Sequence, residues 1–533
     1  MESRYVISIV LEAHLPYVKE YNKEIDLSQA GEEGRFFEYI SETLLPLLEV
    51  LHRLETDHVP FRITLVMSPV LCHMLNDEHL QKKFLNYMDK QIDFGILELE
   101  RTKENNDINK LALDYYNLAV DRRITYTERY EKNLLKAFDF YRRRGKVEII
   151  GSPATHAFLP FLSHNHESLQ AQIETPVSNY RRHFGSNLQG FWFPCLGWTP
   201  SAEEYLKAYN YSFTIVDSHS LLFGSPVPEK GCFFPVKTPN GTIILTRDLL
   251  TLREMEKIAH DEVYRNNNLD AGYLLPAQTV SQFLNAEGGR SMTGYKYWSR
   301  TAAGANGQFT VYNPQAANDK IAKYARTFLE NTIARLEEVS KNMTEIPICL
   351  YANNADFFGS FWHEGTAFIE TLFRMAAGYR DLKFTCPSEY IFRQDISAFQ
   401  IVSPEISSGG VNGYSQTWLD DCNDWIYRHL YRAMERMTEL AERFPDDTGL
   451  KERALNQAAR EIMLAQSSDW PALLYKQDST EFARNKAENT LRNFTTIYEA
   501  LGSNYISTEW LTTLERRHNI FPNINYRVFR RKK

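Results

Sequence analysis

The sequence has no cysteines spaced to share a metal or a disulfide. Its six cysteines are scattered along 533 residues without a CxxC pair, at Cys72, Cys195, Cys232, Cys349, Cys386 and Cys422. This spacing excludes a zinc ribbon and a disulfide framework. No apolar run approaches the ~20 residues that span a bilayer. The start, MESRYVISIVLEAHLP, lacks the basic stretch and cleavage site of a signal peptide. We therefore expect a cytoplasmic protein with no membrane contact.

An excess of positive charge is also missing. The formal net charge is −8, which disfavours nucleic acid as a partner because phosphate binding needs a basic face. No GxGxxG or GxxxxGK[ST] segment is present, so nucleotide-binding folds are disfavoured. Aromatic residues are abundant instead, at 13% of the chain. Aromatic faces suit sugars, although most such side chains form core.

Short apolar runs rich in Ile, Val and Phe predict buried strands. They lie at residues 6–11, 63–67, 147–150, 190–193, 213–216, 242–245 and 346–351. Amphipathic helical patterns separate several of them, and this alternation predicts an α/β fold with a parallel sheet. A barrel is preferred, with its site at the carboxyl ends of the strands. Two long helical stretches break the alternation: residues 72–145 and residues 415–502.

Polar or aromatic residues follow most of these predicted strands. The strand ends read EAHLPY, GSPATHAFLPF, GFWFPCLGWTP, VDSH and NNADFFGSFWHEG. In a parallel barrel these ends meet at one mouth, so their side chains are expected to form one site. The residues concerned are His14, His156, Trp192, Cys195, Asp217, His219, Asn354, Asp356 and Trp362.

In order along the chain, these segments resemble the motifs of the family 57 glycoside hydrolases, in the branch of α-1,4-glucan branching enzymes and α-amylases. The resemblance rests on HLPYV (14–18), ATHAFLPF (154–161), GFWFPCLGW (190–198), NADFFGSFWHEG (354–365), SSGGVNGYSQTWLDDCNDWIYRHL (407–430) and RALNQAAREIMLAQSSDW (453–470). It implies a distorted (β/α)7 barrel over residues 1–405, with a helical insertion at 72–145. Residues 406–533 are expected to form a C-terminal helical domain.

The resemblance also implies a retaining mechanism with two carboxylates about 5–5.5 Å apart. The family pattern W-x-P-E places the nucleophilic glutamate where this chain has Cys195. A second family pattern, D-A-E-L-F-G, places the acid/base aspartate where this chain has Asn354. An amide neither gives nor takes a proton near neutral pH, and a thioglycoside formed on a thiol would hydrolyse slowly. Asp356 is a candidate substitute, with a role in orienting sugar hydroxyls preferred to a role as displaced acid.

Other matching positions imply contacts with an α-glucan. The resemblance assigns substrate binding to His14, His156, Trp192, Asp217, His219, Trp298, Trp362, Trp418 and Asp469. For Trp298 and Trp418, core packing is an equally good interpretation. His14, His156 and Cys195 would make a plausible zinc ligand set, but no fourth ligand is apparent, so neither a metal nor a cofactor is predicted.

Three hypotheses follow. The preferred one is a family 57-like protein that binds glycogen or maltooligosaccharides but is catalytically impaired or inactive. An alternative is an active branching enzyme or glucanotransferase that uses Asp356 or the Cys195 thiolate. The third is a non-enzymatic scaffold that binds a protein partner through its surface.

Overall fold

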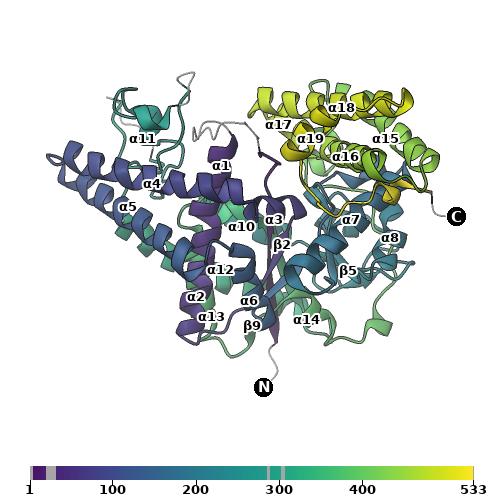
Figure 1. The fold of residues 1–533 in the computed structure, drawn as a ribbon. Helices are drawn as coiled ribbons and strands as arrows, with labels where there is room; N and C mark the ends of the chain where they lie inside the picture. Colours follow the sequence, from purple (N-terminus) through teal and green to yellow (C-terminus); the bar gives the residue numbers. More distant parts are fainter. Residues whose placement is uncertain (1–3, 20–31, 285–288, 302–306, 532–533) are drawn as a thin grey trace.

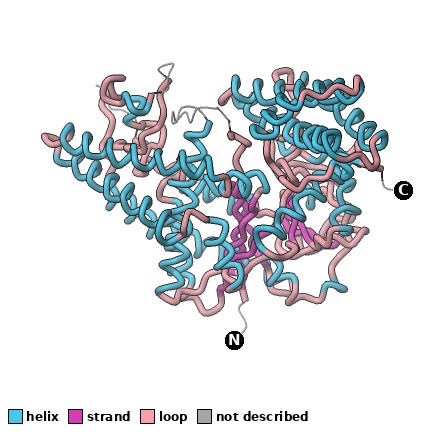
Figure 2. The backbone as a smooth tube through the Cα atoms, in the orientation of Figure 1, coloured by secondary structure: helices cyan, strands magenta, loops and turns pink. Residues whose placement is uncertain are grey.

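The computed structural model describes residues 4–19, 32–284, 289–301 and 307–531. Its centre is a distorted barrel of parallel strands, drawn in magenta in Figure 2. The strands are β1 (Tyr5–Ala13), β2 (Ile63–Met67), β3 (Val147–Ile150), β4 (Gly190–Trp192), β5 (Phe213–Val216), β7 (Ile243–Thr246) and β8 (Ile348–Asn354). Each lies within a few residues of a predicted strand, and the predicted fold class is confirmed.

Two continuous ladders and two seams build the barrel. The ladders run β8–β1–β2–β3 and β4–β5–β7, all parallel. A bridge between Gly151 and Phe191 joins the first ladder to the second. At the other seam, the Asp248 N–H donates to the Leu350 carbonyl over 2.8 Å. The short strands β6 (Val236–Lys237) and β9 (Leu382–Phe384) pair with β7 and β1 outside this ring.

Helices surround the barrel, and several begin at a side-chain cap directly after a strand. Ser68 caps α3 and Asp248 caps α10, each by accepting a backbone N–H of the first turn. The surrounding helices are α1 (Glu32–Tyr39), α2 (Leu45–Thr56), α3 (Pro69–Leu75), α6 (Leu134–Arg143), α7 (His166–Phe184), α8 (Glu203–Ala208), α9 (Ser218–Leu222), α10 (Leu249–Ala259), α12 (Pro314–Ser340), α13 (Gly365–Ala376) and α14 (Pro387–Ile391). The short helix α11 (Ala271–Leu274) lies apart from them, at the upper left of Figure 1.

Two further groups of helices extend the barrel. The long helices α4 (Glu78–Arg101) and α5 (Asn106–Ile124) lie side by side and project to the left in Figure 1. At the upper right of the same view lie the C-terminal helices α15 (Trp425–Arg443), α16 (Gly449–Ala465), α17 (Asp469–Lys476), α18 (Thr480–Gly502) and α19 (Thr508–Arg517). Among the helices within the described ranges, none has both the length and the apolar composition of a membrane span.

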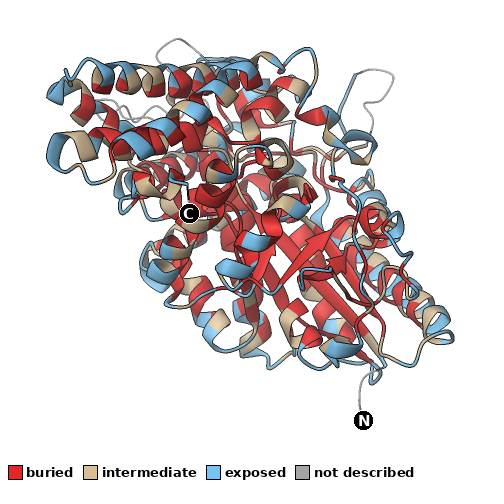
Figure 3. Ribbon diagram, turned by 90° about the vertical axis from the view of Figure 1, so that its right-hand side faces the viewer, coloured by how far each residue is buried: buried red, intermediate tan, exposed pale blue. Residues whose placement is uncertain are grey.

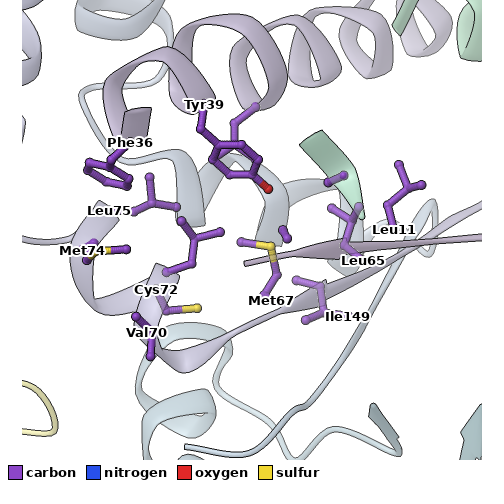
Figure 4. Close-up of a cluster of buried hydrophobic side chains, with 14 of the residues drawn as sticks. Leu11, Phe36, Tyr39, Leu65, Met67, Val70, Cys72, Met74, Leu75 and Ile149 are labelled. Atoms are coloured by element: carbon purple, nitrogen blue, oxygen red, sulfur yellow. The ribbon is translucent and has the colours of Figure 1, made fainter. Parts of the chain in front are cut away.

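Strand alternation divides the buried apolar residues into an inner and an outer core. Val6 and Val10 of β1 point into the barrel, whereas Ile7, Ile9 and Leu11 point outward. Figure 4 shows part of the outer core, where Leu11, Leu65 and Ile149 lie to the right of side chains of α1 and α3. Burial is densest across the strands, and the exposed residues lie mainly on the outer faces of the helices (Figure 3). The outer core continues without a break into the C-terminal helices.

Candidate active site

A cleft of about 510 Å³ opens at the carboxyl ends of the strands. Strand alternation determines which side chains reach it, because the inward-facing positions change from apolar to polar as each strand ends. On β1, Val6 and Val10 are followed inward by Glu12, and on β8, Ile348, Leu350 and Ala352 are followed by Asn354. The residues that line the cleft include Glu12, His14, His156, Trp192, Cys195, Arg247, Asn354, Asp356, Trp418, Ser468, Asp469 and Lys476.

Two stacked imidazoles form the floor of the cleft. The rings of His14 and His156 lie 3.6 Å apart between centroids and within 6° of parallel. His14 Nε2 is 3.1 Å from both oxygens of Asp469, and its Nδ1 is 2.9 Å from the Ser68 hydroxyl. His156 Nε2 is 2.8 Å from Glu12 Oε1, and its Nδ1 is 2.8 Å from the Ser468 hydroxyl. Every ring nitrogen of the pair therefore has a hydrogen-bond partner.

This stacking does not suit a metal ion. One donor atom each from His14, His156 and Asp469 lies within 4.8 Å of the others. In stacked imidazoles, however, the in-plane lone pairs run parallel and do not converge on one point, so a tetrahedral ion would require one ring to rotate. The arrangement favours hydrogen bonds between the two rings and the protein side chains around them.

The charges of the floor are coupled. Burial opposes a positive charge on His156, but the adjacent Glu12 carboxylate raises the pKa of this histidine. Burial and the neighbouring His156 lower the pKa of His14. Burial alone would raise the pKa of Asp469, yet the two histidines and Ser467 lower it to about 2. A proton is therefore favoured on His156 over His14, and Asp469 is ionised at neutral pH.

Cys195 stands over this floor in a left-handed backbone conformation. It follows β4 in a tight turn, with φ 57° and ψ 23°, and its carbonyl accepts the Gly409 N–H over 2.7 Å. Its sulfur is 4.0 Å from the Ser468 hydroxyl. Burial and the Glu12 carboxylate raise the pKa of the thiol well above its usual value. The thiol is therefore protonated at neutral pH and is a poor nucleophile.

Asn354 and Asp356 line the opposite wall. Asn354 ends β8, is exposed, and lies in register with Glu12 of β1. Asp356 follows two residues later in the sequence, in a short 3-10 turn that spans Ala355–Phe358. Burial raises the pKa of the Asp356 carboxyl, and Lys476 acts in the opposite direction. The structure therefore brings Cys195, Asn354 and Asp356 to one cleft.

Four of the residues assigned from the motifs do not line the described cleft. Asp217 caps α9 and forms an ion pair with Arg247, and His219 Nε2 is 2.7 Å from the Gly413 carbonyl. Trp362 is fully buried among Tyr264, Phe358 and Phe368. Trp298 packs beside Phe309 near the inserted helices. The expectation of ligand contact is therefore corrected for Trp362, whose indole is sealed inside an aromatic cluster.

Trp192, Trp418 and Asp469 do line the cleft, as expected. Trp418 stacks on Phe158 at 4.4 Å between centroids. The motifs gave no role to Glu12, Ser68, Arg247, Ser468 and Lys476, which the structure adds. For Glu12 the sequence holds a signal: it is a lone charge in an apolar strand, two residues before His14 and hence on the same face.

Comparison with known proteins agrees with this architecture. Residues 8–401 match the model of glycosyl hydrolase family 57, and residues 429–529 match that of the C-terminal region of 1,4-α-glucan branching enzymes. The chain therefore belongs to glycosyl hydrolase family 57, as its motifs predicted.

Relatives of known structure resemble the chain over its whole length. The α-amylase AmyC of Thermotoga maritima has a TM-score of 0.91 and 32% identity, with 100% of each chain covered. A GH57-type branching enzyme of Pyrococcus horikoshii has a TM-score of 0.88 and 24% identity, covering 100% of this chain and 98% of that one. A 1,4-α-glucan branching enzyme of Thermococcus kodakarensis is 26% identical over 545 aligned residues, which cover 97% of this chain and 77% of the relative.

Proposed function

We propose that this chain binds α-glucans in the cleft but is impaired in, or incapable of, cleaving or transferring them. The observation that carries the proposal is the chemistry at two cleft positions. Cys195 and Asn354 stand where the family motifs place the two catalytic carboxylates, and both line the cleft. The relatives named above are an α-amylase and α-glucan branching enzymes, which supports an α-glucan as the ligand.

The cleft retains groups that suit a sugar. Trp192 and Trp418 line the cleft, although they are only 3% and 4% exposed, and contribute an apolar wall against which a glucose ring can pack. Glu12, Asn354 and Lys476 offer acceptors and donors to hydroxyl groups. These features favour binding, and none of them needs the missing carboxylates.

Retaining catalysis needs groups that these side chains do not supply. A protonated thiol with a raised pKa neither attacks the anomeric carbon efficiently nor stabilises an oxocarbenium-like centre by charge. The Asn354 amide cannot protonate a leaving oxygen. Loss of a positioned acid/base alone typically lowers the rate by about 10²–10⁴-fold, and loss of the nucleophile adds to this.

Restoring both carboxylates tests the proposal. The assay measures branching and hydrolysis of amylose by the natural chain, by Cys195→Glu, by Asn354→Asp and by the double variant. We expect background rates from the natural chain and from each single variant, and measurable turnover from the double variant alone. Turnover of about 1 s⁻¹ or more by the natural chain would refute impaired catalysis.

A second candidate function, residual glucan transfer with Asp356 as the acid, is favoured by one observation. Asp356 lines the cleft, and burial raises the pKa of its carboxyl, as an acid catalyst requires. If this function operates, Asp356→Asn abolishes any slow turnover of the natural chain. An unchanged rate in that variant would eliminate it.

A further inference from the structure

Glu12 is a charged residue on the inner face of an apolar strand. It lies near the end of β1, its side chain is 5% exposed, and it lines the cleft. Burying a carboxylate is unfavourable unless hydrogen bonds or opposite charges compensate. The structure provides a hydrogen bond to one of the two carboxylate oxygens, which compensates for part of this cost.

Among the described residues, only one of the two Glu12 oxygens has a hydrogen-bond partner. Oε1 is 2.8 Å from His156 Nε2, and the Ser468 hydroxyl at the other ring nitrogen fixes the orientation of that ring. Oε2 has no hydrogen-bond partner among the described residues and is not sealed from the cleft. One acceptor oxygen is thus held in a defined position and presented to whatever occupies the cleft.

Glu12 lies close to both residues that depart from the family motifs, Cys195 and Asn354. It lies in register with Asn354 on the neighbouring strand, and both side chains face inward. On its other side, its charge acts on the Cys195 thiol. A glucose unit placed between Cys195 and Asn354 would therefore lie beside the free oxygen.

We propose that Glu12 accepts a hydrogen bond from a hydroxyl of the bound glucose unit, and so provides the charged acceptor that Cys195 and Asn354 no longer provide. This inference rests on the proposed function and makes Glu12 a specificity-determining residue for glucan binding. It gives Glu12 no part in bond cleavage, since His156 already holds one of its oxygens.

The test is calorimetric titration of maltoheptaose into the natural chain, Glu12→Gln and Glu148→Gln. Glu148 is a matched control, because it is a glutamate on a barrel strand at the opposite, amino end of the barrel. We expect Kd to rise about tenfold or more in Glu12→Gln, since hydrogen bonds to charged groups are the stronger class, and to stay unchanged in Glu148→Gln. An unchanged Kd in Glu12→Gln would refute the inference.

A second titration separates direct contact from support of His156. Maltotriose and its 2-deoxy, 3-deoxy and 6-deoxy analogues, altered in one glucose unit at a time, are compared in the natural chain and in Glu12→Gln. If Glu12 contacts the sugar, one missing hydroxyl weakens binding to the natural chain but has little effect in the variant. Equal losses in both proteins for every analogue would refute direct contact.

Two controls keep the outcomes distinct. If the natural chain does not bind maltoheptaose, the proposed function fails; if it binds and Glu12→Gln binds equally, only this inference fails. If Glu12→Gln does not fold, Glu12→Asp replaces it, because it keeps the charge and withdraws the oxygens by about one carbon–carbon bond. A Kd unchanged in Glu12→Asp would then count against the contact.

Discussion

At the scale of single residues, a comparison of Trp418 with Trp298 tests whether a tryptophan at the cleft contributes to glucan binding. Trp418 lines the cleft, whereas Trp298 packs beside Phe309 away from it. We expect Trp418→Leu to raise the Kd for maltoheptaose about fivefold or more, because loss of this buried indole, which stacks on Phe158, alters the shape of the cleft wall. Trp298→Leu is the matched variant and leaves the Kd unchanged. Titration calorimetry reads both, and equal effects of the two substitutions would contradict the assignment.

Glu148 gives a residue-scale prediction for pH. Its carboxyl is buried at the amino end of the barrel, where it accepts long hydrogen bonds of 3.4 Å from Thr64 and Ser388, and burial raises its pKa to about 7. Between the ordinary glutamate pKa and about 7, the folded state therefore binds more protons than the unfolded state. Stability is greatest below this window and falls as pH rises through it.

The expected loss is up to about 3 kcal/mol of unfolding free energy between pH 4.5 and pH 7.5. Glu148→Gln removes the titrating group and flattens this part of the profile. Urea unfolding at a series of pH values measures the effect. An identical slope in the natural chain and in the variant would contradict the raised pKa.

At the scale of elements, a buried ionic cluster attaches the projecting helices to the barrel. Glu42, in a π-helical turn before α2, binds Arg122 of α5 over 2.9 Å and the fully buried Arg265 over 2.6 Å. Removing one partner of a buried ion pair typically lowers stability by about 3–5 kcal/mol, because the other charge stays buried and unpaired. We expect this loss for Glu42→Ala.

Glu131 provides the comparison for that substitution. It forms an exposed ion pair with Lys136, and exposed pairs contribute about 0–1 kcal/mol. Glu131→Ala is therefore expected to change the free energy of unfolding little. Denaturant titration of both variants measures the difference, and similar small effects would show that the Glu42 cluster is not what secures the helices.

The elements themselves were largely predictable, but their lateral contacts were not. The barrel strands were found because each is a short β-branched or aromatic run bounded by turn residues. The strands β6 (VK) and β9 (LKF) escaped because each contains a lysine and neither forms an apolar run. At the cleft, motifs located Cys195 and Asn354. The hydrogen bonds of Asp469 to His14 were not predictable, because 455 residues separate the partners and only the docking of α17 brings them together.

At the scale of the whole molecule, the C-terminal helices and the barrel share one outer core. The buried cluster runs without interruption from Ile7 and Leu11 of β1 to Met434 and Leu455 of the C-terminal helices. Both parts also contribute residues to the cleft, because Ser468 and Asp469 of the C-terminal part bind the histidines of the barrel. We therefore expect calorimetry of the full chain to give a single unfolding transition, which maltoheptaose shifts as one peak. Two resolved peaks would show that the two parts unfold independently.

The backbone of Cys195 has a consequence for how function is distributed over this chain. A side chain other than glycine in the left-handed region typically carries about 1–3 kcal/mol of strain, and the surrounding turn must hold it there. The turn therefore fixes the direction in which the side chain at position 195 points, whichever residue stands there. An exchange of this residue changes the chemistry of the cleft and leaves its main chain in place.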